Sequence, residues 1–78
     1  MILKYLTIKN KGMETETCQW NYIDGITQAS TFVDFTDKEK PCTMVNILMK
    51  DMTSVAYALH NEAYLLNDYG TTIEKIRM

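Results

Sequence analysis

The chain has 78 residues, of which 46% are hydrophobic and 23% are charged, and its formal net charge at pH 7 is −2. This composition is that of a globular chain, and the length allows a single small domain over residues 1–78. The slight acidic excess argues against direct binding of DNA or RNA, because neutralising phosphates needs a basic surplus. It is also too small for an acidic surface that imitates DNA.

The sequence predicts a soluble cytoplasmic protein with no membrane partner. Lysines interrupt residues 1–9, so this segment lacks the apolar run of a signal peptide. No apolar stretch reaches the length of a membrane span. Cys18 and Cys42 lack the CxxC spacing of a redox or zinc motif, which favours two reduced, partly buried thiols.

The first expected element is a strand from Ile2 to Lys9, which is rich in β-branched and aromatic residues and is closed by residues 10–12. Residues 14–23 form the next extended run. The pair Asp24-Gly25 follows and is typical of a two-residue type I′ turn. We therefore expect a hairpin in which Ile23 faces Ile26 across the turn.

The alternation of side chains along strands divides this expected hairpin into two faces. The face predicted to be the core side carries Cys18, Trp20, Tyr22, Ala29, Val33 and Phe35. The opposite face, rich in amides with isolated hydrophobic residues, is predicted to be a solvated or recognition surface. Its members are Gln19, Asn21, Ile23, Ile26, Gln28, Ser30, Phe32 and Asp34.

A charged connector, residues 36–41, leads to a predicted amphipathic helix over about 43–60, with Thr43 as its N-cap. Helical spacing places one apolar stripe on it. The stripe consists of Val45, Leu48, Met52, Val55, Ala56 and Leu59. The alternative is a strand at 43–49 followed by a shorter helix that starts near Asp51.

The last part of the chain divides at residues 67–70, where a short loop with Gly70 near its end suits a hairpin. The competing interpretation extends the helix to Asn67 and uses Gly70 as its stop. In both, residues 71–77 form the final strand. The predicted fold class is α+β: about five strands, mostly antiparallel, in the order β-β-β-α-β-β, with the helix packed on one face of the sheet.

No motif for chemistry emerges. His60 has no partner at metal-ligand spacing, and the serines and cysteines lie outside any nucleophile motif. None of the glycines belongs to a phosphate-binding loop. We therefore expect no catalytic residue, no cofactor and no metal, and the chain is predicted not to be an enzyme.

The remaining function is binding to another protein, with a homodimer as a further expectation because dimerisation offsets a thin core. The residues predicted to make the contact are Ile23, Ile26, Gln28, Phe32, Ile47 and Tyr57. In size and style the chain is similar to many small proteins of bacteriophages and mobile elements, which often bind and inhibit a host protein such as a defence nuclease. That similarity, which assigns no residue, implies an inhibitor in the host cytoplasm.

Two other functions stay open. One is a structural or accessory subunit of a larger assembly. The other is a weak nucleic-acid binder that uses four lysines together with Tyr5. The lysines are Lys9, Lys11, Lys38 and Lys40.

Overall fold

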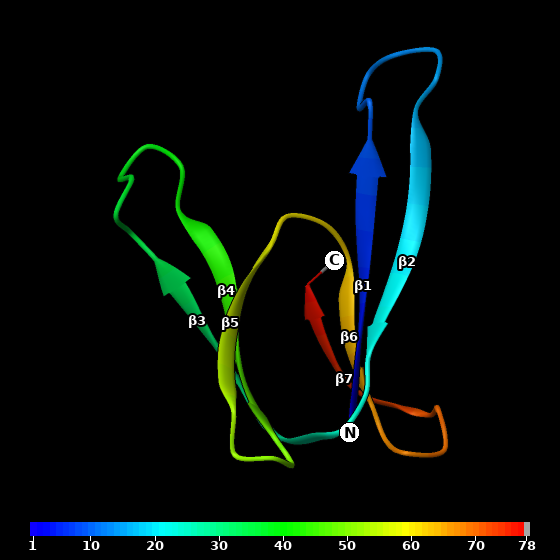
Figure 1. The fold of residues 1–78 in the computed structure, drawn as a ribbon. Coiled ribbons are helices and arrows are strands. Elements are labelled where there is room, and N and C mark those ends of the chain that lie inside the picture. Colours follow the sequence, from blue (N-terminus) through cyan, green and yellow to red (C-terminus); the bar gives the residue numbers. More distant parts are fainter. Residues whose placement is uncertain (78) are drawn as a thin grey trace.

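The computed structural model describes residues 1–77, which form seven strands and no helix. The strands are β1 (Ile2–Lys9), β2 (Thr17–Ile23), β3 (Ile26–Asp34), β4 (Cys42–Met49), β5 (Ser54–Leu59), β6 (Ala63–Leu66) and β7 (Thr72–Arg77). They make two antiparallel sheets: sheet A has the order β2-β1-β6-β7, and sheet B has the order β3-β4-β5 (Figure 1). The predicted α+β fold is therefore wrong, and the chain is all-β.

The segment predicted as a helix is the β4–β5 hairpin. Its buried side chains recur every second residue, as Val45 and Ile47 in β4 and as Tyr57 and Leu59 in β5, where Tyr57 is half-buried. This period of two belongs to strands. The helical stripe fails at Met52, which is 79% exposed in the turn. The alternative of a strand at 43–49 is correct, whereas its helix from Asp51 is wrong.

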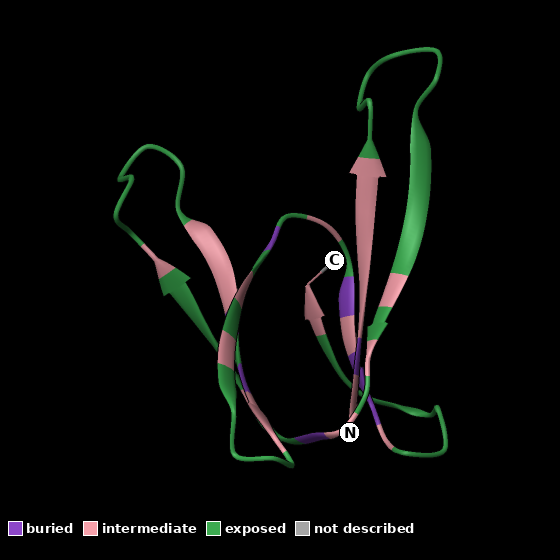
Figure 2. Ribbon diagram, viewed as in Figure 1, coloured by how far each residue is buried: buried purple, intermediate pink, exposed green. Residues whose placement is uncertain are grey.

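The core lies where the two sheets converge. Both sheets contribute to it, through Leu3, Ile26, Val45, Ile47, Leu59, Ala63 and Leu65. The far ends of the β1–β2 and β3–β4 hairpins extend away from this core and are exposed (Figure 2). A small shared core means that each sheet needs the other for its stability.

Asp24 and Gly25 carry the chain from sheet A to sheet B and do not form the predicted hairpin turn. A type I′ turn needs positive φ at both central residues. Here Gly25 has a φ of 75°, and Asp24 is not among the described residues with positive φ. The backbone of Met1 exchanges two hydrogen bonds with Ile26, at 3.0 and 3.2 Å, and Lys50 N–H donates to the Gly25 carbonyl. Pairing with distant segments therefore overrides the local turn signal.

Two sequence predictions are confirmed at the ends of the chain. The first strand spans Ile2–Lys9, as expected. The last two strands form a hairpin in which Gly70 has a φ of 86°. The side-chain oxygen of Asn67 closes the loop by accepting hydrogen bonds from the N–H groups of Tyr69 and Thr71.

No helix in the described range is long and apolar enough to cross a membrane.

Candidate functional site

Strand β1 is apolar on both of its faces. Leu3 and Tyr5 point toward sheet B, where Leu3 is buried and the Tyr5 ring lies 6.4 Å from that of Tyr57. Leu6 and Ile8 alternate with them and therefore point to the outer side of sheet A. An antiparallel sheet normally presents a polar outer face to water. The outer side of β1 departs from that rule.

A row of alternating aromatic and lysine side chains crosses the outer side of sheet A. Lys4 on β1 pairs with Tyr22 on β2 and with Tyr64 on β6, and Tyr64 in turn pairs with Lys75 on β7. The Lys75 ammonium lies 5.9 Å from the centroid of the Tyr64 ring. Each lysine thus lies next to an aromatic ring across the strands, a placement that stabilises a cation through the ring quadrupole.

Trp20 joins this row from β2, opposite Leu6. Its ring centroid is 6.1 Å from that of Tyr64, and the Lys4 ammonium lies 4.6 Å from the indole. The indole is 37% exposed and Tyr22 is 60% exposed, so the prediction that both face the core is wrong. We call the surface formed by Lys4, Leu6, Ile8, Trp20, Tyr22, Tyr64 and Lys75 the aromatic face.

The carboxylate of Glu62 borders the aromatic face. The Tyr64 hydroxyl donates a 2.9 Å hydrogen bond to Glu62, and this bond, with the nearby negative charge, raises the pKa of Tyr64. The two lysines have no such partner, since the one ion pair within residues 1–77 joins the Met1 amine and Asp68. The face therefore carries two cations that form no ion pair within residues 1–77.

The residues predicted from the sequence as a binding surface do not lie together. Gln28 and Phe32 point outward on sheet B, and Phe32 is 47% exposed. Ile26 and Ile47 are buried in the core, so the expected exposure of both is wrong. The last two members, Ile23 and Tyr57, are half-buried and pack against the core. Of the six, only Gln28 and Phe32 share an exposed face.

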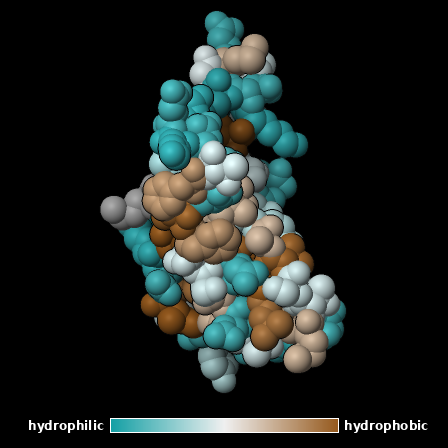
Figure 3. Space-filling model, turned by 90° about the vertical axis from the view of Figure 1, so that its left-hand side faces the viewer, coloured by the Kyte–Doolittle hydropathy of each residue, from teal (hydrophilic) through white to brown (hydrophobic). Residues whose placement is uncertain are grey.

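The outer side of sheet B is the second exposed surface. Figure 3 views the molecule from that side and shows hydrophobic groups gathered in its middle and lower parts, with hydrophilic groups above. A shallow hollow of about 290 Å³ lies in it and is lined mainly by polar side chains. These are Gln28, Ser30, Asn46 and Ser54, together with Leu48. Among the described residues, the outer side of sheet A is the surface that combines Trp and Tyr with lysines that form no ion pair.

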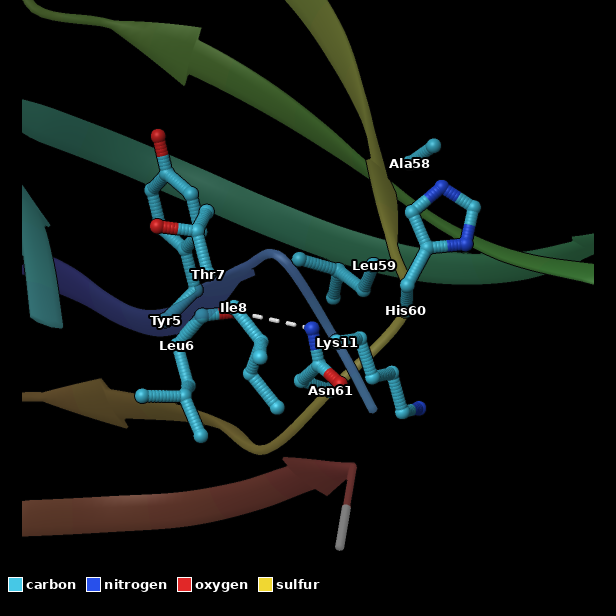
Figure 4. Close-up of a pocket in the computed structure, with 9 residues that line it drawn as sticks. All are labelled: Tyr5, Leu6, Thr7, Ile8, Lys11, Ala58, Leu59, His60 and Asn61. Carbon is cyan, nitrogen blue, oxygen red and sulfur yellow. Dashed lines mark hydrogen bonds between the residues drawn. The ribbon is translucent and has the colours of Figure 1, made fainter. Parts of the chain in front are cut away.

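A pocket of about 280 Å³ lies beside the upper part of β1 (Figure 4). Its lining residues are Tyr5, Leu6, Thr7, Ile8, Lys11, Ala58, Leu59, His60 and Asn61. The carboxamide of Asn61 donates to the Leu6 carbonyl at 3.3 Å, just before β6 begins at Ala63. His60 lines the pocket without a carboxylate or a thiol among the other lining residues. His60 therefore has no carboxylate partner in this pocket for acid–base catalysis.

The cysteine thiols are both free, with Cys18 exposed and Cys42 half-buried. Within residues 1–77 no group of three or more His, Cys, Asp or Glu side chains is arranged to hold a metal ion. Comparison of the chain with protein-family models, curated proteins and solved structures finds no match.

Sequence reasoning missed the aromatic face because it paired β2 with β3. In the structure β2 pairs with β1, so Trp20 lies beside Lys4, Leu6 and Tyr64 on the outer side of sheet A and not in the core. One signal was visible in the sequence. Residues 2–8 are apolar at both odd and even positions, a pattern typical of a strand covered on both sides.

Proposed function

We propose that this chain is a non-enzymatic module that binds another protein through the aromatic face. One observation carries the proposal: the outer side of an antiparallel sheet displays apolar and aromatic side chains where water would normally favour polar ones. Covering these side chains with a partner removes their apolar area from water and stabilises the complex.

The composition of the face supports a protein partner. Trp and Tyr dominate the residues that contribute most binding energy in protein interfaces. Here Trp20 and Tyr22 on β2 and Tyr64 on β6 lie on either side of β1. Because strands hold these side chains, little conformational freedom is lost on binding. A rigid platform of this kind suits a module whose activity is contact.

The experiment is affinity capture from cells of the native host, with mass spectrometry of the recovered proteins. Tyr22→Asp and Trp20→Ala are expected to reduce recovery of the partner by about tenfold or more, because each removes an anchor of the aromatic face. Tyr22 is 60% exposed on an edge strand, so its substitution leaves the core intact.

Phe32→Asp is the matched control, because Phe32 is 47% exposed on the outer side of the other sheet. Recovery that survives this change but fails with Tyr22→Asp supports the proposal. The opposite result moves the interface to sheet B, as the sequence predicted for Phe32. Recovery that withstands all three substitutions contradicts binding through either face.

The captured partner then decides between two modes of action. We propose inhibition, as in the small phage and mobile-element proteins that the chain resembles in size and style. Adding the purified chain to the purified partner should lower the partner's activity in proportion to occupancy. An accessory subunit would instead leave the activity unchanged or raise it, and would co-purify in a fixed ratio.

A further inference from the structure

We infer that the aromatic face receives a segment of its partner in which carboxylates flank an apolar side chain. The inference rests on the proposed protein-binding function and specifies the chemistry of the partner. The row Tyr22–Lys4–Tyr64–Lys75 is the basis, because it places two cations within an otherwise apolar and aromatic surface.

The charge of the two lysines requires a counterpart when the face is covered. Each ammonium lies over an aromatic ring, and neither forms an ion pair with any carboxylate of residues 1–77. A purely apolar partner would strip water from these cations without replacing its hydrogen bonds, which disfavours binding. A partner carboxylate would supply both the opposite charge and the acceptors.

The spacing of the cations defines the segment further. Lys4 and Lys75 lie on strands separated by one intervening strand, so their backbones are about 10 Å apart. Tyr64 lies between them in the same row. A segment that crosses the strands can therefore place one carboxylate at each lysine and an apolar side chain on the tyrosine ring.

Single-stranded nucleic acid is the competing occupant, because aromatic rings with lysines also form platforms on which bases stack. The charge of the whole chain argues against it. The net charge is −2, whereas binding a phosphate backbone depends on a basic surplus. The observations thus favour an acidic segment of a protein, and oligothymidine serves as the test of the alternative.

The test selects peptides from a displayed library of random short sequences against the intact chain. Enriched peptides are expected to carry Asp or Glu next to aliphatic or aromatic residues. The chain's single tryptophan, Trp20, reports binding directly. A selected synthetic peptide should shift its emission to shorter wavelength and protect it from a soluble quencher.

Charge reversal supplies the decisive comparison. Lys4→Glu combined with Lys75→Glu should weaken the selected acidic peptide by about tenfold or more and should shift a new selection toward Lys and Arg. Lys38→Glu combined with Lys40→Glu changes the net charge equally in the exposed β3–β4 loop and should leave both results unchanged. This control separates local pairing from long-range attraction.

Three results would overturn the inference. If the enriched peptides change the Trp20 emission but show no preference for acidic residues, the inferred specificity for carboxylates is wrong. The aromatic face would then still be a protein-binding surface. If the selection enriches no peptide, the inference that the face binds a short acidic segment is wrong. Affinity capture still tests the proposed protein-binding function independently. Oligothymidine that binds more tightly than the selected peptides, with an affinity that falls steeply with salt, would replace the protein segment by nucleic acid.

Discussion

Strand alternation gives Ile47 and Phe32 opposite surroundings, although both lie in sheet B. Ile47 on β4 points to sheet A and is 0% exposed, in contact with the shared core. Phe32 on β3 points to the outer side, opposite Met44. The larger residue therefore contributes less to stability than the smaller one, because burial and not size decides how much area leaves water.

Truncating these two residues should separate them clearly. Ile47→Ala is expected to lower the free energy of unfolding by about 2–4 kcal/mol, since it leaves a cavity in the core. Phe32→Ala should cost about 1 kcal/mol or less. Urea unfolding of both variants measures the difference. Equal losses would mean that the outer side of sheet B is also covered within the folded chain.

The carboxylates of Asp34 and Asp51 each accept hydrogen bonds from the threonine two residues later in the chain. The hydroxyl and the backbone N–H of Thr36 donate to Asp34 and lower its pKa from the ordinary value of 3.8. The pKa of Asp51 is lowered by hydrogen bonding to Thr53, whose backbone N–H donates at 3.0 Å. The charged form is thus favoured in the folded state. Its contribution to stability is present above the ordinary pKa and is lost as the pH falls through the lowered one.

Thr36→Val tests this coupling because it removes the hydroxyl and keeps the shape of the side chain. The pKa of Asp34 should rise toward its ordinary value, while the backbone N–H of residue 36 retains part of the shift. Asp51 in the same molecule is the internal control and should not change. A titration of the carboxyl carbons by NMR measures both residues, and an unchanged Asp34 would contradict the role of the hydroxyl.

At the scale of elements, the β4–β5 hairpin shows why the sequence predicts a helix over about 43–60 where the structure has two strands. The buried side chains of β4 and β5 follow a period of two, but Leu48 and Met52 fall between them at spacings that also suit a helix. The deciding feature is the turn at residues 50–53, where Met52 has a φ of 73°. A left-handed methionine has no signal in the sequence, whereas the glycine in the β6–β7 turn does.

Met52→Gly should therefore stabilise the chain. The left-handed conformation costs an L-residue roughly 1–2 kcal/mol, and glycine returns part of that gain through its larger entropy in the unfolded chain. We expect a net gain of about 0.5 kcal/mol in urea unfolding. Asn10→Gly is the control, because Asn10 has a φ of 56° but asparagine tolerates this region. A loss of stability on Met52→Gly would show that its side chain contributes contacts that outweigh the backbone strain.

For the whole molecule, the sequence predicts strands better than it predicts their partners. The strand at residues 2–9 and the final hairpin can be predicted because the β-branched and aromatic content of the first and the glycine turn of the second are local signals. The pairing of β1 with β6 joins segments distant along the chain, and the pairing of β2 with β1 spans the loop of residues 10–16, which carries no two-residue turn signal like that of Asp24-Gly25. The aromatic face depends on that pairing. The alternation of side chains places Gln28 and Phe32 outward correctly, but with the wrong partner strand it places Trp20 in the core.

Hydrogen exchange should follow the position of each residue relative to the shared core. Leu3 on β1 and Val45 on β4 are both buried in it, so their amides should exchange only through global unfolding and with the same free energy. Lys9 is exposed at the far end of the β1–β2 hairpin, beyond the core, and should exchange faster through local opening. Exchange monitored by NMR measures all three amides. Unequal protection of Leu3 and Val45 would mean that the sheets unfold separately, and slow exchange at Lys9 would mean that the hairpin end is covered. Adding the partner should slow exchange along β2, because the aromatic face includes side chains of that strand.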